Sequence, residues 1–332
     1  MRSKVGSAEL ARTPHPSPPA RGRALVLGVD GGGTKTRAVI TEAREHVLGE
    51  GVAGPSNPLR VGVAAAVAAI GEAVDKACAA ADVQQSDLIA AEIGLAGVRR
   101  GDLRERMREA LRVLGIKALS IVTDADIALF GGTNGAPGVV IIAGTGSVCC
   151  GINARGRREY AGGWGPLAGD EGSGSWIARR ALQSVARASD GRGPETELTE
   201  AACEYLKVAT PEDISTAIYA PGMTNDRIAG YARYVIEEAT KGDAVARDIL
   251  ADAGRELGIA ANAVIRRLRM ENERFQVAYV GGVFSAGELM LEPLRKEVAR
   301  LAPRAYLAPP LLAPAVAAAR MAREQLQLAL AG

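Results

Sequence analysis

Apolar and polar positions follow two different periods along the chain, and together they predict an α/β protein. Short apolar runs bounded by glycine or polar residues indicate strands. Segments rich in Ala, Glu and Arg with apolar residues about 3.6 positions apart indicate helices. The first half of the pattern predicts strands at 24–29, 35–41, 46–51, 88–95 and 118–123, and helices at 61–81, 101–114 and 125–131.

The same order of elements begins again after a predicted breaker of Gly, Asn and Pro at 131–137. The second half predicts strands at 138–143, 148–153, 157–161, 276–281 and 304–308, a helical block over 173–269, and helices at 286–299 and 311–328. Each half is thus a hairpin sheet followed by helix, strand, helix, strand and helix. The repeat predicts two similar lobes, while an ordinary mixed α/β protein with two hairpins stays open as the alternative.

The turn between the first two predicted strands has the composition of an anion-binding site. This first glycine turn follows Asp30 and consists of Gly31, Gly32, Gly33, Thr34, Lys35 and Thr36. Glycines let backbone N–H groups approach a phosphate, threonine hydroxyls can donate to it, and the carboxylate of Asp30 can hold Mg²⁺ directly or through water. The segment matches neither the P-loop nor G-x-G-x-x-G. A glycine-rich turn without a ligand is the alternative.

Two further glycine segments occupy related positions in the second half. The second glycine turn, between the first two strands of that half, consists of Gly144, Thr145, Gly146 and Ser147. Two such turns facing each other across a cleft could hold the two ends of a polyphosphate. The third glycine segment, 280–285, follows a predicted strand, and Gly281 and Gly282 could let the backbone pack on an adenine ring. A tight strand–helix turn is the alternative there.

Asp124 and Asp126 lie where a predicted strand ends and a helix begins. Ligands bind at the carboxyl ends of strands in open α/β sheets, and a carboxylate there can orient and deprotonate an attacking hydroxyl. A helix N-cap is the alternative role for either residue. We favour the base for Asp124 and the cap for Asp126.

The glycine-rich loop at 162–176 contains two tryptophans and an acidic pair. Carboxylates and exposed amides suit sugar hydroxyls, so Gly163, Trp164, Gly165 and Asp170 are candidate sugar contacts, while Glu171 is a candidate cap for the following helix. The two tryptophans are expected to bury apolar area, which disfavours a plain surface loop. Asn57, in the turn before the first long helix, is a plain turn residue on local grounds.

Composition excludes several classes of function. With 40 Lys and Arg against 38 Asp and Glu, the net charge of +2 offers no basic field for nucleic acid or an anionic membrane. The two histidines disfavour a Ser-His-Asp triad and a His-based zinc site, and the four cysteines, none in C-x-x-C, suit buried thiols in the cytoplasm. No apolar run is long enough to span a membrane. Residues 1–23, rich in Pro and Arg, are expected to be a disordered extension rather than a secretory signal.

Together these segments resemble the acetate and sugar kinase, Hsp70 and actin superfamily, in the branch of N-acetylglucosamine kinases and BadF/BadG/BcrA/BcrD-type ATPases. The resemblance extends over residues 24–328. It implies a two-lobed actin-like, ribonuclease H-like ATPase fold with a nucleotide cleft, an N-terminal lobe at 24–135, and a C-terminal lobe at 136–332 whose last helix can pack back toward the first lobe. The glycine-rich loop is similar to that family's sugar-binding loop.

The resemblance also implies the chemistry. The first and second glycine turns are similar to the family's phosphate motifs, the third glycine segment to its adenosine motif, and Asp124 to its catalytic Asp. It implies ATP and Mg²⁺, a cytoplasmic homodimer, an amino-sugar substrate, and sugar contacts from Asn57, Asp124 and Thr145. Val148 stands where the nearest kinases often carry Asn, and this departure leaves the sugar open. An ATPase that drives a partner protein and a non-catalytic sensor are the alternative functions.

Overall fold

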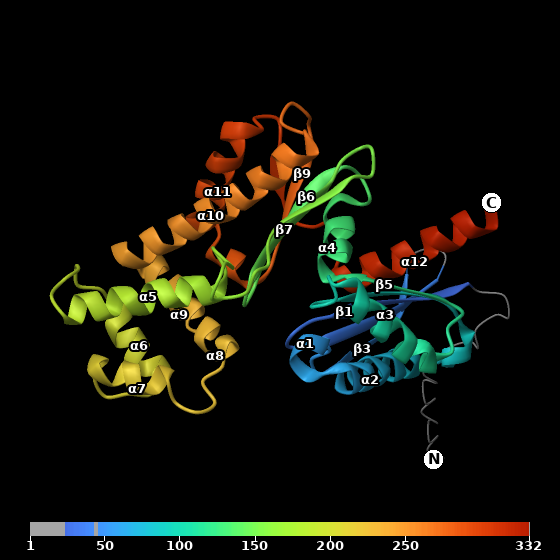
Figure 1. Cartoon of the computed structure of the whole chain (residues 1–332), viewed down its shortest axis with the longest axis horizontal. Helices are drawn as coiled ribbons and strands as arrows, with labels where there is room; N and C mark the ends of the chain where they lie inside the picture. The colour runs from blue at the N-terminus through green and yellow to red at the C-terminus, as the bar shows by residue number, and fades with distance from the viewer. Residues whose placement is uncertain (1–23, 43–45, 332) are drawn as a thin grey trace, which may run out of the picture.

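Two five-stranded mixed sheets form the framework of the computed structural model, which describes residues 24–42 and 46–331 (Figure 1). Each sheet is covered by helices, so the two-lobed α/β fold predicted from the sequence is confirmed. The predicted extension at 1–23 lies outside the described residues.

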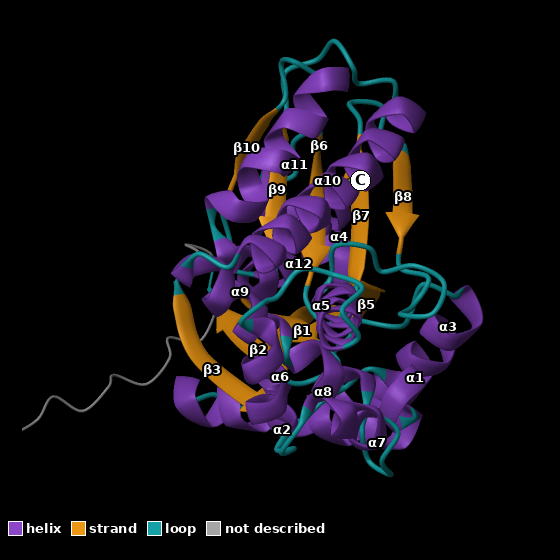
Figure 2. Cartoon of the chain, turned by 90° about the vertical axis from the view of Figure 1, so that its left-hand side faces the viewer, coloured by secondary structure: helices purple, strands orange, loops and turns teal. Residues whose placement is uncertain are grey.

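The two sheets have the same topology. The first contains β1 (Leu25–Gly31), β2 (Thr36–Thr41), β3 (Val47–Ala53), β4 (Leu88–Leu95) and β5 (Ala118–Thr123), in the order β3-β2-β1-β4-β5. The second contains β6 (Gly138–Ala143), β7 (Ser147–Ile152), β8 (Arg158–Gly162), β9 (Gln276–Val280) and β10 (Tyr306–Ala308), in the order β10-β9-β6-β7-β8 (Figure 2). In each sheet the hairpin strands pair antiparallel and the later strands add in parallel. The predicted duplication is therefore confirmed.

The helices follow the predicted order with small differences at their ends. The first half contains α1 (Pro58–Val61), α2 (Val63–Ala81), α3 (Gly101–Ala110) and α4 (Asp124–Thr133). The second contains α5 (Gly174–Ser189), α6 (Leu198–Leu206), α7 (Ile214–Ile218), α8 (Asn225–Gly230), α9 (Ala232–Lys241), α10 (Ala244–Leu268), α11 (Glu288–Leu301) and α12 (Pro314–Ala331). Gly62, with a φ of +80°, separates α1 from α2. Among the described residues we find no helix with the length and apolar character that crossing a bilayer requires.

The predicted break at Gly131 and Gly132 is wrong, because α4 continues through both glycines to Thr133. A Cβ at Gly132 would lie 2.6 Å from the Cβ of Ala278 on β9. Gly132 therefore serves close packing of α4 on the second sheet, while a Cβ at Gly131 would lie 2.9 Å from the Leu312 carbonyl oxygen just before α12. In Figure 1, α4 stands between the two lobes.

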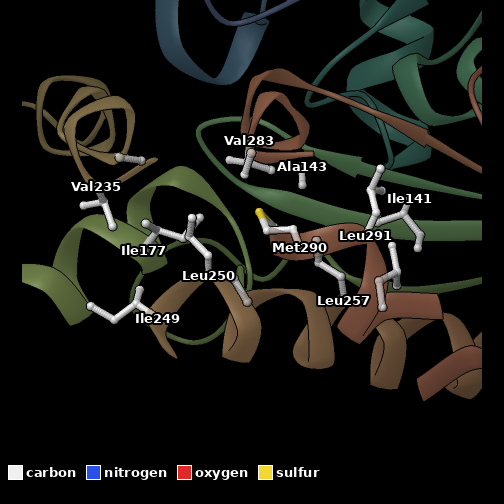
Figure 3. Packing of buried hydrophobic residues seen from close by; sticks show 14 of the residues in the cluster. Ile141, Ala143, Ile177, Val235, Ile249, Leu250, Leu257, Val283, Met290 and Leu291 are labelled. Atoms are coloured by element: carbon white, nitrogen blue, oxygen red, sulfur yellow. The ribbon is translucent and has the colours of Figure 1, made fainter. Parts of the chain in front are cut away.

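The largest apolar core lies in the second lobe, between its sheet and the helices α5, α9, α10 and α11. Figure 3 shows Ile177, Leu250 and Met290 from three of these helices close to one another. The thiols of Cys78, Cys149 and Cys150 are buried, as predicted, while Cys203 is partly exposed. This core supports the inserted helices that carry one side of the candidate site.

The C-terminal helix α12 packs on the first sheet rather than on the second. Ala315, Ala319 and Ala322 form a small cluster with Val26, Val39 and Ala90 of that sheet. A Cβ at Gly28 would lie 2.1 Å from the carbonyl oxygen of Ala315, so β1 has glycine where the helix backbone approaches. The chain thus returns to its first lobe at its C-terminal end.

Glu92 is fully buried on β4 beneath α12. Its carboxyl accepts hydrogen bonds from Ser120 Oγ (2.9 Å) and Gln325 Nε2 (2.7 Å). Burial raises its pKa from the ordinary value of 4.5 to about 7, and the nearby charge of Asp126 adds to the rise. The folded protein therefore binds this proton more tightly than the unfolded chain does, so stability is lost as the pH rises from about 4.5 to about 7.

Replacing Glu92 by Gln is expected to raise the free energy of unfolding at pH 8 by about 1–3 kcal/mol, because the neutral amide avoids the cost of a buried charge. The effect should vanish near pH 4. Urea unfolding at both pH values measures it, with Glu105→Gln on the exposed face of α3 as the matched control. Equal pH dependence in Glu92→Gln and the unmodified protein would contradict the assignment.

Candidate functional site

The first glycine turn closes the β1–β2 hairpin and is tied to two neighbouring loops. Gly32 N–H donates to the Lys35 carbonyl (3.0 Å), and the Gly32 carbonyl accepts from the N–H groups of Ser56 (3.1 Å) and Asn57 (3.2 Å). The Gly31 carbonyl accepts from Ala96 N–H (2.8 Å) in the loop after β4. The turn is thus a fixed backbone platform, with Thr34 and Lys35 exposed on it and Gly33 half-buried.

Thr36 has a structural role that differs from the predicted phosphate contact. Its side chain is fully buried, and its hydroxyl donates to the Gly54 carbonyl (2.7 Å) and contacts Ser56 Oγ (2.8 Å). The Ser147 hydroxyl of the second glycine turn is likewise directed away, since it donates to the Glu171 carbonyl (2.7 Å). Among the predicted hydroxyl donors, Thr34 and Thr145 remain at least partly exposed.

Sheet register places Asp124 beside the first glycine turn. Gly31 of β1 pairs with Leu95 of β4, which pairs with Thr123 of β5, so the three strands end in one row. Two strand spacings separate the ends of β1 and β5 by about 10 Å. Asp124 is the first residue of α4 and follows this row directly. The carboxylate of Asp124 therefore lies at the edge of the sheet that carries the first glycine turn.

The electrostatics of this edge are those of two close carboxylates. Burial, with the charges of Asp30 and Asp126 adding to it, raises the pKa of Asp124 from 3.8 to about 6 against the opposing hydrogen bond from Ala125 N–H (2.9 Å). Burial also raises the pKa of Asp30, while the positive charges of Lys35 and Arg37 lower it. Asp124 is thus ionised above about pH 6 and able to accept a proton near neutrality.

Asp126 caps α4 and joins it to the second lobe. The N-cap residue is Thr123, and Asp126 completes a capping box by accepting from Thr123 N–H (3.1 Å). This arrangement agrees with the capping role favoured for Asp126, although from the third helical position. Its carboxylate also accepts from Tyr160 O–H (2.9 Å) and pairs with Arg158, both on β8. The start of α4 is therefore held to the strand that leads into the glycine-rich loop.

The second and third glycine segments meet at one cavity. Ala143 pairs with Ser147 and Ile142 with Val280, so both segments leave the same edge of the second sheet. Gly281 has a φ of +127°, and a Cβ there would lie 2.0 Å from the Ala143 carbonyl oxygen, so only glycine fits. A cavity of about 410 Å³ opens between them, lined among others by Gly144, Thr145, Asp226, Ala229, Gly282 and Ser285.

The glycine-rich loop is anchored to the second glycine turn through Asp170. Asp170 is buried with a φ of +58°, and its carboxylate accepts from the N–H groups of Gly165 (Oδ1, 3.3 Å) and Ser147. Burial raises its pKa, and these two donors oppose the rise. Gly163 N–H donates to the Ser147 carbonyl (2.9 Å). The loop backbone therefore lies along the second glycine turn.

Two expectations for this loop are wrong. Trp164 does not bury its ring, since 74% of the residue is exposed, and only Trp176 packs partly against the core. The cap of α5 is Ser173, whose Oγ accepts from Trp176 N–H, rather than Glu171. Contact between water and the apolar surface of an exposed indole is unfavourable unless another group covers that surface. The indole of Trp164 is therefore available to pack against a ligand.

Asn57 also differs from the plain turn residue favoured locally. It is the N-cap of α1, where its Oδ1 accepts from Leu59 N–H (3.0 Å). A Cβ at Gly97 would lie 2.4 Å from that oxygen, so Asn57 lies against the loop after β4. Its place beside Gly32 and that loop puts it at the same edge as Asp124.

A family model described as the BadF/BadG/BcrA/BcrD ATPase family matches residues 27–322. The chain belongs to this family. The match spans both lobes, so the recognition predicted from the glycine turns, Asp124 and the glycine-rich loop is confirmed. Membership makes the chain an ATPase-family protein.

Proteins that resemble this chain in sequence or in structure are named as sugar kinases. An N-acetylmuramic acid/N-acetylglucosamine kinase of Clostridium acetobutylicum is 35% identical over 272 residues, covering 82% of this chain and 89% of the relative. An N-acetyl-D-glucosamine kinase of Dictyostelium discoideum is 32% identical over 310 residues, covering 90% and 97%. A solved structure from Chromobacterium violaceum, provisionally assigned as an N-acetylglucosamine kinase, is 29% identical with a TM-score of 0.73, covering 90% and 98%.

Sequence reasoning missed the inserted helices as part of this ATPase-family site. Asp226 and Ala229 of α8 line the 410 Å³ cavity, and Arg60 of α1 pairs with Asp226. The predicted block over 173–269 was uniform in helical character, so periodicity did not separate α8 from its neighbours. The Pro-Gly break at 221–222 and the Thr224 N-cap are the local features that could have marked its start.

Proposed function

We propose that this protein is an ATP-dependent kinase that transfers a phosphoryl group to the primary hydroxyl of an amino sugar. The observation that carries the proposal is the position of Asp124. Its carboxyl lies at the end of β5, level with the first glycine turn on β1, and burial raises its pKa to about 6. A base there orients the sugar hydroxyl and takes its proton as the phosphoryl group moves.

The donor side of the proposed reaction is built by the three glycine segments. The backbone N–H groups of Gly33 and Gly146 are assigned to the phosphates, with Thr34, Lys35 and Thr145 as side-chain donors. Gly31, Gly32 and Gly144 are assigned to the shape of the two turns, since the N–H groups of Gly32 and Gly144 donate to the carbonyls of Lys35 and Gly146. Gly281 and Gly282 are assigned to adenosine, supported by Gly282 in the lining of the 410 Å³ cavity and by Gly281 directly before it in the chain. Thr36 and Ser147 are assigned to hold the two turns in place, since their hydroxyls are bonded elsewhere and the Ser147 N–H donates to Asp170.

The proposed metal residue is Asp30. Within 24–42 and 46–331, no group of three or more His, Cys, Asp or Glu side chains could hold a metal ion by itself. Mg²⁺ at a nucleotide needs only one or two carboxylates besides phosphate oxygens and water. Asp30, beside Asp124 at the cleft edge, fits that need. Bound there, Mg²⁺ would neutralise charge on the phosphates.

The acceptor side is assigned to Asn57, Gly163, Trp164, Gly165 and Asp170, with Asp124 and Thr145 adjoining. Exposed Trp164 offers an apolar face for a sugar ring, and Asp170 holds the loop that presents the amides of Gly163 and Gly165. The names of the relatives favour N-acetylglucosamine as substrate, with glucosamine beside it. The homodimer and the absence of nucleic-acid or membrane partners stay predictions.

A coupled assay of ADP release tests the function across glucosamine, N-acetylglucosamine, N-acetylmuramic acid, N-acetylmannosamine and glucose. We expect the highest kcat/KM with an amino sugar, because an acetamide or amine changes only a few pocket contacts but each is worth a measurable factor. An ATPase rate that is the same with every sugar would instead support action on a partner protein. Sugar and nucleotide binding without turnover would support a sensor.

A further inference from the structure

One ion pair joins the two lobes next to the first glycine turn. Arg60 lies on α1 of the first lobe, and Asp226 lies on α8 among the inserted helices, 166 positions later. Arg60 Nη1 donates to Asp226 Oδ1 at 3.0 Å, and Nη2 donates to Oδ2, so the pair is bidentate. Both side chains keep more than a third of their surface exposed to water. The contact is therefore accessible to a competing anion.

The guanidinium of Arg60 lies directly on the first glycine turn. A Cβ at Gly33 would come within 2.8 Å of Arg60 Nη1 and 3.8 Å of its Cζ. The turn that starts α1 is held in place by the hydrogen bonds from Ser56 and Asn57 to Gly32. The same short segment therefore positions Asn57, the turn backbone and the Arg60 guanidinium.

Asp226 connects this guanidinium to the second lobe. Asp226 lines the 410 Å³ cavity together with Gly144, Thr145 and Gly282. Arg60 thus lies between the turn proposed for one end of the polyphosphate and the cavity proposed for the rest of the nucleotide. A carboxylate at that place occupies the guanidinium donors while it repels any phosphate that approaches.

Energetics favour exchange of the partner. A solvent-exposed Arg–carboxylate pair contributes little to stability. A polyphosphate carries several negative charges and offers the planar guanidinium a bidentate set of oxygens. We propose that Arg60 is a phosphate-binding residue of this site and exchanges Asp226 for phosphate oxygens of ATP when the nucleotide binds. This inference rests on the proposed kinase function and adds to it a residue that the glycine motifs do not contain.

Isothermal titration of the full chain with ATP, ADP and adenosine tests the exchange. Arg60→Ala should raise the Kd for ATP about 10- to 100-fold, the factor expected when a hydrogen bond to a charged group is lost, and leave adenosine binding unaffected. Asp226→Asn should change ATP binding in the opposite direction, tightening it by up to about 5-fold, because the competing partner is removed.

Arg108→Ala is the matched control, because Arg108 also forms an exposed bidentate pair, with Glu105 on α3. Thermal melts confirm that each variant is folded. A similar loss of ATP affinity in Arg60→Ala and Asp226→Asn would overturn the inference, since the pair would then act only as a link between lobes. Unchanged ATP affinity in Arg60→Ala would overturn it as well. If the unmodified protein binds no ATP, the proposed function fails first and the inference with it.

Discussion

Asp124→Asn is expected to lower kcat for sugar phosphorylation by about 10²- to 10⁴-fold, the range for loss of a positioned general base. Asn keeps the size of the side chain and can still accept from Ala125 N–H, so α4 should begin at the same residue. It cannot take the proton of the sugar hydroxyl. Steady-state assays give kcat, and isothermal titration should show ATP affinity within a few-fold of the unmodified protein.

The pH profile of the unmodified protein supplies the control for this prediction. Because the pKa of Asp124 is raised to about 6, kcat/KM should fall tenfold per pH unit below about pH 6 and level off above it. The residual activity of Asp124→Asn should not show this fall of kcat/KM below about pH 6. Near-normal turnover in Asp124→Asn, or a profile identical to the parent's, would contradict the assigned base.

Asp170→Ala should produce the second largest effect, raising the sugar KM by about 10- to 100-fold. The buried carboxylate accepts from Gly165 and Ser147 N–H groups, and its removal leaves both donors unsatisfied and frees the glycine-rich loop from the second glycine turn. A φ of +58° also disfavours Ala at this position. Steady-state kinetics at saturating ATP separate KM from kcat, and urea unfolding should show a loss of about 1–3 kcal/mol.

Two variants control for the loop itself. Asp170→Asn tolerates positive φ and retains an acceptor, so it should recover most of the stability that Asp170→Ala loses. Leu167, 99% exposed in the same loop, should tolerate Ala with little change in either quantity. A sugar KM for Asp170→Ala close to that of Leu167→Ala would remove Asp170 from the acceptor side.

The order of the elements and the two hairpins that carry the glycine turns were predictable because each depends on local pattern. Short apolar runs identified the ten strands found among the described residues, and the Gly-Thr turns at 31–36 and 144–147 marked the two hairpins of a duplication. The position of Asp124 followed from the rule that ligands meet the carboxyl ends of parallel strands. Local reasoning misplaced Trp164 and the break at Gly131, because burial and close helix packing depend on residues distant in the chain.

The sequence by itself thus determined the duplicated two-lobed fold, the family and the acidic candidate base, since these depend on spacing and residue type. Tertiary structure alone decided which side chains meet. It directed the hydroxyls of Thr36 and Ser147 away from the cleft, buried Glu92 beneath α12, and brought Arg60 to Asp226 across 166 positions. The physical reason is that a hydrogen bond or an ion pair acts over a few ångströms, and only the packing of the lobes brings such partners within that range.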